Sequence, residues 1–287
     1  MSYRNFVPEV LSQTILKELR AKTVFAQGCH NEFTGEITKA GESIKFAGLG
    51  DPTVHTIAFA DRNKAIPAPE ELQDSILEMP IRQIRAVNFM VGDIDQAQAR
   101  GDLLRIAKES VPEVLADSVD TYIAGLHATD DDAIKFNNGT AIKVARGESS
   151  ETQKNPLDLI DDLVEALSYN NVAQSTPLEM IVSPKFYKLC KQEYRDLDTD
   201  NSQLMSSGRV GRYNRVVIKQ STNISVSGST QFLLIRTPRY MGYADALNNV
   251  EPYRHPDYFG DFIKALHLFD AKVIRPKEGF YVPVTMA

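Results

Sequence analysis

The sequence has only two cysteines, Cys29 and Cys190, which lie far apart. A disulfide framework needs more cysteines at closer spacing, so a reducing compartment fits this count. No uninterrupted apolar run approaches the roughly 20 residues needed to cross a bilayer. The first residues also lack the basic-then-apolar order of a signal peptide. These absences predict a protein that folds and acts where it is made, without a membrane partner.

A surplus of basic residues is also missing. Lys and Arg total 32 against 38 Asp and Glu, which gives a formal net charge of −6. Proteins that follow duplex DNA through its phosphates usually carry a positive excess. We therefore expect any contact with nucleic acid to be sparse and non-specific. The hydrophobic content of 43% is nevertheless high enough for burial to offset chain entropy, so the chain is expected to fold.

No catalytic or metal-binding motif stands out. The five histidines and two cysteines do not show the spacing of zinc ligands. The adjacent pair Cys29–His30 lacks a third group that would orient a nucleophile and its base. Acidic residues at 196, 198 and 200 begin like a calcium loop, but Asn201 and Ser207 stand where that loop needs Gly and Glu. We expect no catalytic, metal-binding or cofactor-binding residue, and no enzyme.

The first third of the chain combines one amphipathic helix with a long extended region. From Pro8 to about Gln27 apolar residues recur three and four positions apart, which predicts a helix that docks on its own domain or on a partner. From Glu32 to about Val91 the period changes to two, as in β-strands, with a hairpin expected around Ala40–Gly41. Isolated two-stranded ribbons are marginal in water. We therefore expect an arm of this kind to lie against the surface of a partner.

Asp93 opens the strongest helical pattern in the chain, with an apolar stripe that continues over several turns. Asp93 or Asp95 is placed to cap the start of this helix. Pro112 removes a backbone hydrogen bond and clashes with the preceding turn, which predicts a kink or break near Ser110. The polar, turn-rich stretch 128–154 then marks the best candidate domain boundary.

From residue 155 onward helices and strands alternate. Asn155–Pro156 and Ser183–Pro184 each join a capping residue to a first-turn proline, which predicts two helix starts. Strands are expected at 178–183, 215–219, 231–236 and 262–274. The pattern predicts a mixed α/β unit.

Six stretches carry a family resemblance. They are FVPEVL near the start, GEITKAGESIKF with LGDPTV, IRAVNFMVGDIDQAQA, IVSPKFYKL, GRVG with VVIKQS, and YFGD with DAKVIRP. Together they span Phe6 to Val284 and resemble the major capsid proteins of tailed bacteriophages, which have the Hong Kong 97 fold. No single stretch is specific, whereas their order along the chain is. One departure is Asn214, which stands where the family usually has glycine and which can still adopt a positive φ.

The resemblance implies an α+β fold of the Hong Kong 97 type, divided into five segments along the chain. These are an N-terminal helix and arm (1–31), an extended β-hairpin or E-loop (32–80), a P domain with a long spine helix (81–154), a mixed α/β A domain (155–243), and the return strands of the P-domain β-sheet (244–287).

The resemblance also implies a function. The chain would self-assemble through hexamers and pentamers into an icosahedral virion capsid around double-stranded DNA, and it would do so in the host cell cytoplasm. Expected partners are copies of itself and the portal and head-completion proteins. Because the chain lacks the long N-terminal extension of some family members, a separate scaffolding protein is also expected.

Contacts between neighbouring subunits are expected along the E-loop and at two arginines of the A domain. The E-loop residues are Ile37, Lys39, Glu42, Ile44, Lys45, Phe46 and Asp51, and the arginines are Arg209 and Arg212. Apolar members would pack on the neighbour and charged members would pair, each exposed ion pair contributing about 0–1 kcal/mol. Some family members cross-link an E-loop lysine to a neighbouring asparagine. Neither the acceptor nor the activating acid can be matched in this sequence, so no cross-link is expected.

Two other interpretations stay open at this point. An encapsulin-like compartment shell shares the fold and recruits cargo enzymes in place of a genome. A soluble α/β enzyme with an unfamiliar site would account for the pattern after residue 155, but not for a long ribbon that lacks its own core.

Overall fold

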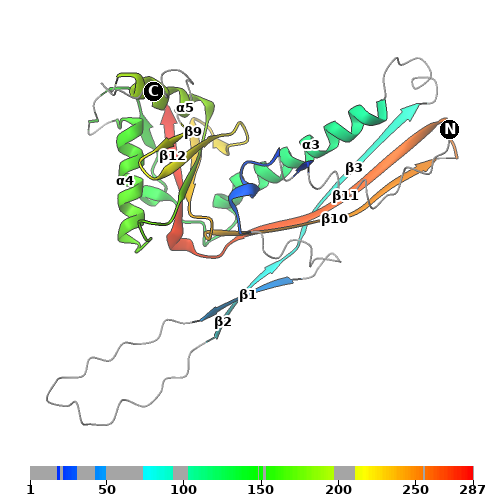
Figure 1. The fold of residues 1–287 in the computed structure, drawn as a ribbon, viewed down its shortest axis with the longest axis horizontal. Helices are drawn as coiled ribbons and strands as arrows, with labels where there is room; N and C mark the ends of the chain where they lie inside the picture. The colour runs from blue at the N-terminus through cyan, green and yellow to red at the C-terminus, as the bar shows by residue number, and fades with distance from the viewer. Residues whose placement is uncertain are drawn as a thin grey trace, which may run out of the picture.

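The computed structural model describes residues 18–19, 22–30, 43–49, 74–92, 103–147, 149–150, 153–196, 211–254 and 256–286. These residues form a mixed α+β fold with three parts (Figure 1): a long three-stranded sheet crossed by one helix, a larger mixed sheet with two helices, and a two-stranded ribbon. None of the helices in this part of the chain has the length and apolar character needed to span a membrane.

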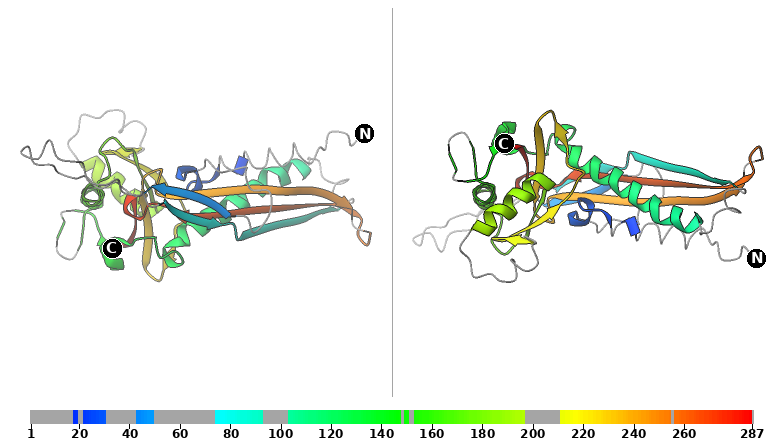
Figure 2. Two further views of the ribbon diagram at one scale, coloured as in Figure 1. Left: turned by 90° about the horizontal axis from the view of Figure 1, so that it is seen from below. Right: turned by 90° about the horizontal axis from the view of Figure 1, so that it is seen from above.

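The long sheet has the strand order β10-β11-β3, and all its neighbours are antiparallel. Its strands are β3 (Gln83–Gly92), β10 (Met241–Arg254) and β11 (Gly260–Val273). Helix α3 (Leu103–Gly125) crosses one face of this sheet diagonally (Figure 2). On that face Val87 and Phe89 pack against a cluster formed mainly by α3. Because side chains of a strand alternate between its two faces, the intervening β3 side chains point to the opposite face.

Pro112 lies inside α3, so of the kink or break predicted near Ser110 the break is wrong. The helix is continuous, and Pro112 is buried within it. Val111 and Leu115, on either side of the proline, are buried with Ala265 of β11. This tertiary packing holds a turn that helix propensity alone disfavours.

The larger sheet has seven strands in the order β4-β12-β9-β5-β7-β6, with β8 paired to β9. In chain order the strands are β4 (Ile142–Val144), β5 (Leu178–Val182), β6 (Arg212–Tyr213), β7 (Val216–Gln220), β8 (Val226–Ser227), β9 (Thr230–Arg236) and β12 (Gly279–Met286). Helices α4 (Pro156–Tyr169) and α5 (Pro184–Asp196) bury apolar faces in the same core as the sheet. Short 3-10 helices are η2 (Ala26–Gly28), η4 (Leu126–Ala128), η5 (Phe136–Gly139) and η6 (Pro276–Glu278).

Local signals in the sequence correctly place several of these elements. The Asn155 side chain caps α4 by accepting the Leu157 N–H at 2.9 Å, and Ser183 Oγ accepts the Phe186 N–H at 3.2 Å at the start of α5. Asn214 has a φ of 52° in the turn between β6 and β7. The residue that stands in place of the family's glycine thus adopts the positive φ that glycine readily takes. The strands β5, β7, β9 and β11 fall on the four predicted strand regions.

The described part of the N-terminal helix packs on its own subunit. Leu19 is fully buried against Val111, Leu115 and Ala116 of α3. The sequence left open whether this helix packs on its own domain or on a partner. Leu19 packs on its own domain. Residues 8–17, 20 and 21 of this predicted helix lie outside the described part of the chain.

Candidate intersubunit surfaces

A two-stranded ribbon projects away from both sheets (Figure 1). Its strands β1 (Ser43–Leu49) and β2 (Asp74–Pro80) pair antiparallel, with Ser43 opposite Pro80. Only Ile81 and Arg82 separate β2 from β3, which belongs to the long sheet. The extended region predicted for Glu32 to Val91 is therefore not one arm, because its last part, from Gln83 onward, forms a strand of the subunit's body. The hairpin expected around Ala40–Gly41 lies outside the described residues.

The base of the ribbon is held by apolar packing within the subunit. Ile44, Met79 and Ile81 are 8%, 1% and 2% exposed, and they cluster with Ala244 and Leu268 of the long sheet. Phe46 packs beside them, and a β-carbon at Gly242 would come within 2.8 Å of its ring. Ile44 and Phe46, which the sequence assigned to a neighbouring subunit, thus lie in an intrachain cluster. Their contact with a neighbour stays a prediction.

The charged residues of the ribbon also find partners within the chain. Lys45 Nζ lies 3.1 Å from Glu78 Oε1 across the two strands, and both side chains are more than half exposed. Lys272 Nζ donates to the Glu78 carbonyl oxygen at 3.3 Å. Each such exposed pair contributes about 0–1 kcal/mol. Apolar packing at the base therefore fixes the ribbon more strongly than its charges do.

Of the remaining predicted contact residues, the structure describes Arg212 alone. Arg212 is exposed on β6, which is the outer strand of the seven-stranded sheet. Its neighbour Tyr213 donates from its hydroxyl to Asp161 at 2.9 Å. Residues outside the described part of the chain are Ile37, Lys39, Glu42, Asp51 and Arg209, together with the helix-cap candidates Asp93 and Asp95 and the acidic positions 198 and 200.

Exposed apolar side chains of the long sheet were missed by sequence reasoning. Ile84 and Met90 of β3 are each 50% exposed, and alternation with Val87 and Phe89 places them on the face opposite α3. Near the turn between β10 and β11, Tyr258 and Phe259 are also exposed, and Tyr258 contacts the Phe262 ring edge-on. The alternation of β3 was visible in the sequence, but it was attributed to the projecting arm.

The N-terminal segment is tied to the larger sheet by a buried arginine. Arg236 of β9 is fully buried, and its guanidinium donates to the Phe25 carbonyl oxygen, to Cys29 Sγ at 3.1 Å and to Glu179 Oε1 at 3.2 Å. A β-carbon at Gly28 would lie 2.6 Å from Arg236 Nη2, so glycine permits this close approach. Burial raises the pKa of the Cys29 thiol. Cys29 therefore has the surroundings of a structural cysteine.

A second buried group, Asp120 of α3, holds the same segment from the other side. Its carboxylate accepts the backbone N–H groups of Val24 at 2.8 Å and Phe25 at 3.1 Å. Burial raises the pKa of Asp120 to about 6, although these N–H groups and the charge of Arg236 act to lower it. Two charged side chains from separate elements therefore fix the short stretch that leads into η2.

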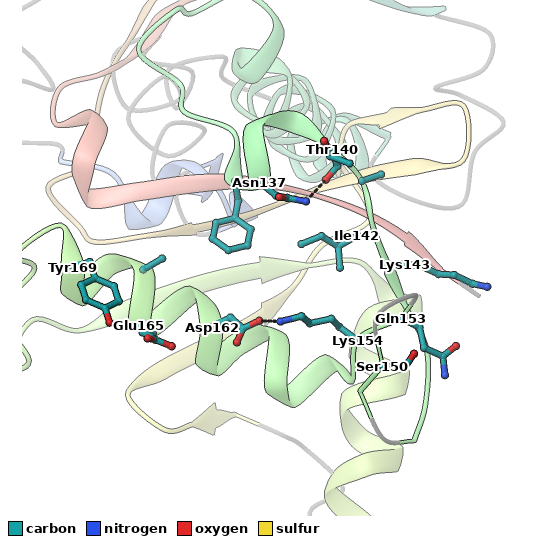
Figure 3. Close-up of a pocket in the computed structure, with 13 residues that line it drawn as sticks. Asn137, Thr140, Ile142, Lys143, Ser150, Gln153, Lys154, Asp162, Glu165 and Tyr169 are labelled. Carbon is teal, nitrogen blue, oxygen red and sulfur yellow. Dashed lines mark hydrogen bonds and ion pairs between the residues drawn. The ribbon is translucent and has the colours of Figure 1, made fainter.

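The described residues line several hollows. The hollow in Figure 3, about 650 Å³, lies between α4 and β4, where Lys154 pairs with Asp162 and Asn137 donates to the Thr140 carbonyl oxygen. Tyr169, at its margin, is 79% exposed. Within the described part of the chain, no three metal-binding side chains gather into a possible ion site.

Replacing Met79 with alanine should loosen the ribbon without unfolding the body. Truncating a buried methionine costs about 2–5 kcal/mol, and this side chain lies in the small cluster at the ribbon base. Hydrogen exchange should show faster opening of the β1 and β2 amides, with the amides of α4 unchanged. Lys45→Ala is the matched control, because loss of an exposed pair should leave exchange nearly unaltered. Equal effects of both variants would contradict the assignment of the cluster.

Comparisons with known proteins identify the fold. No family model and no curated protein matches the chain. A solved structure from Mycobacterium phage Che8 aligns with a TM-score of 0.69 and 23% identity over 91% of this chain and 90% of that one. The capsid of cyanophage P-SCSP1u aligns with a TM-score of 0.67 and 15% identity over 92% and 88%. A virus-like particle from Pyrococcus furiosus aligns with a TM-score of 0.53 and 14% identity over 96% and 98%.

These likenesses extend over more than nine tenths of this chain at low sequence identity. The chain thus has the mixed α+β fold of Hong Kong 97-type capsid proteins, as the resemblance in its sequence implied.

Proposed function

We propose that this chain is the major capsid protein of a tailed bacteriophage. Copies of it would assemble through hexamers and pentamers into an icosahedral shell that encloses double-stranded DNA. The observation that carries the proposal is the ribbon β1–β2, which is fixed at its base and projects from a body with a capsid fold. A two-stranded ribbon is marginal in water without a covering surface. A neighbouring subunit supplies that surface in a shell.

The structural parts support an assignment of segments within this proposal. We assign the ribbon to the E-loop (32–80), the long sheet with α3 to the P domain, the larger sheet to the A domain, and residues 1–31 to the N-terminal arm. The boundaries drawn from the sequence need one change. β4 and β12 fall in segments 81–154 and 244–287, yet both pair within the larger sheet, so we move them to the A domain.

The partners follow from the same proposal. Neighbouring subunits come first, and the portal, head-completion and scaffolding proteins complete the particle in the host cytoplasm. The formal net charge of −6 supports sparse and non-specific contacts with the packaged DNA. The proposed role is architectural, with no cofactor and no catalytic step.

An encapsulin-like compartment shell is the second candidate. The alignment with the virus-like particle from Pyrococcus furiosus, which covers 98% of that chain, favours it. Its fold-level similarity is lower than that of the two phage structures, with a TM-score of 0.53 against 0.69 and 0.67. Particles purified from the native source would separate the two, because a capsid holds nucleic acid and a compartment holds a cargo protein.

Assembly of the purified chain tests the proposal directly. We expect size-exclusion chromatography to give a species far larger than the 32.0 kDa subunit and negative-stain microscopy to show rings or shells, alone or with a co-expressed scaffolding protein. The Met79→Ala variant should fold and yet assemble less, because its ribbon is loosened. A well-behaved monomer under all these conditions would overturn the proposal.

A further inference from the structure

β3 forms an open edge of the long sheet. Among the described residues its only strand partner is β11, along the whole length from Gln83 to Gly92. The other side of an edge strand presents unpaired N–H and C=O groups that can template another strand. Natural proteins usually protect such edges with short strands, bulges, prolines or charged side chains.

The other edges of the two sheets carry that protection, and β3 does not. β10, at the opposite edge of the long sheet, has a register shift between Leu247 and Asn249 and contains Pro252. The outer strands β4 and β6 have three and two residues. β3 has ten residues in unbroken register, without proline, and Arg85 is its one charged side chain. A long, regular and unprotected edge is suited to receive a strand.

We propose that β3 pairs antiparallel with β3 of a second copy across a two-fold axis, which joins two long sheets into one six-stranded sheet. This inference rests on the proposed function, because a shell supplies the second copy. The sequence of β3 favours a second copy as the partner strand, because apolar residues can face apolar residues when β3 pairs antiparallel with itself.

Side-chain direction restricts the register of this pairing. Directly opposed residues point to the same face of a sheet, so the axis must pass through a residue position and not between two. With Val87 on the axis, Ile84 faces Met90 of the second copy, Arg85 faces Phe89, and Ala86 faces Asn88. Moving the axis to Ala86 pairs Ile84 with Asn88, and moving it to Arg85 sets two like charges against each other. The Val87 register overlaps as many residues as an axis at Asn88 does. The Asn88 axis sets Ile84 against Gly92, whereas the Val87 register joins Ile84 with the apolar Met90.

The two faces of the paired strands would then have different roles. On the helix side, Arg85 already donates to Ser118 of α3 at 2.9 Å, and Val87 and Phe89 pack on the cluster beneath α3. On the opposite side Ile84 and Met90 are each half exposed. In the joined sheet Ile84 of each copy packs against Met90 of the other copy, which gives one such pair on each side of the axis.

Disulfide trapping tests both the partner and the register. We would make Ala86→Cys and Asn88→Cys as separate full-length variants, assemble them singly and mixed, and oxidise mildly. The native Cys29 and Cys190 are buried, so background cross-linking should be low. In the Val87 register the introduced thiols oppose each other only in the mixture. In single-variant assemblies they are diagonal neighbours at roughly 7–8 Å, beyond the usual reach of a disulfide.

We expect a covalent dimer in the mixed assembly at least tenfold more abundant than in either single-variant assembly. Shells that form without this excess would overturn the β3 pairing and leave the proposed function standing. A chain that stays monomeric and gives no dimer would overturn both.

A charge exchange gives an independent check on the same register. Ile84→Lys and Met90→Glu should each reduce assembly, and the double variant should recover it, because each introduced lysine then faces an introduced glutamate. If both single variants assemble normally, or if the double variant is as impaired as either single one, β3 does not pair in this way. Circular dichroism of each variant would confirm that the subunit is folded.

Discussion

Replacing Arg236 with methionine is expected to lower the free energy of unfolding of the subunit by about 3–5 kcal/mol. The guanidinium is fully buried and serves three acceptors, on Phe25, Cys29 and Glu179. The methionine side chain is about as long as that of arginine but apolar, so it fills the space and donates no hydrogen bond. The Phe25 carbonyl oxygen then keeps only the weak donor of the Cys29 thiol, and the Glu179 carboxylate loses a buried cation. The cost arises from these two losses.

Urea denaturation followed by circular dichroism would measure this loss, with Lys219→Met as the matched control. Lys219 Nζ pairs with the other oxygen of the same carboxylate, Glu179 Oε2, at 2.9 Å, but its side chain is 30% exposed. Solvent screens such a pair, so its removal should cost less than about 1 kcal/mol. Similar losses in the two variants would mean that burial does not set the strength of the Arg236 contacts.

Arg236 also shows where sequence reasoning reaches its limit. The helix starts at Asn155 and Ser183 were predictable because the capping side chain and the N–H that it accepts are two or three residues apart. The Arg236 contacts join residues 57 to 211 positions apart. A single sequence has no local pattern for such contacts. In the sequence, the adjacent Cys29–His30 pair raised the question of a catalytic nucleophile and base, whereas in the structure Cys29 is one of the contacts of Arg236 that hold the N-terminal segment.

The candidate interfaces were predictable only as far as strand periodicity allowed. Alternation of apolar residues correctly indicated strands between 75 and 91, but periodicity does not identify a strand's partner. β2 pairs with β1 in the ribbon, whereas β3 pairs with β11, and only Ile81 and Arg82 lie between them. Pro112 shows a related limit, since its cost to a helix is local and the packing that offsets it comes from a distant strand.

The pH dependence of stability should carry a clear contribution from Asp120. Burial raises the pKa of this carboxyl from 3.8 to about 6 in the folded subunit, so the folded state binds the proton more tightly than the unfolded chain does. The resulting stabilisation is fully present below pH 3.8 and is lost as the pH rises through about 6. The difference between the two pKa values corresponds to about 3 kcal/mol.

Comparison of the Asp120→Asn variant with the unmodified chain isolates this contribution, because the other titrating groups cancel. Asparagine keeps one oxygen to accept from Val24 or Phe25 and removes the buried charge. The lost second acceptor lowers stability by about 1–3 kcal/mol at every pH. Superimposed on that offset, the variant should gain about 2.5 kcal/mol on the unmodified chain between pH 4 and pH 7.5, as measured by urea denaturation. A difference that is constant with pH would contradict the raised pKa.

The same reasoning links Asp120 to Arg236. The charge of Arg236 acts to lower the pKa of Asp120, so removing it should raise that pKa further and make the buried carboxylate costlier at neutral pH. Arg236→Met should therefore lose more stability at pH 7.5 than at pH 4, and in the Arg236→Met, Asp120→Asn double variant that additional loss should disappear. If it persists, the two charged groups act on residues 24–29 independently, and the segment has two separate anchors in place of one coupled network.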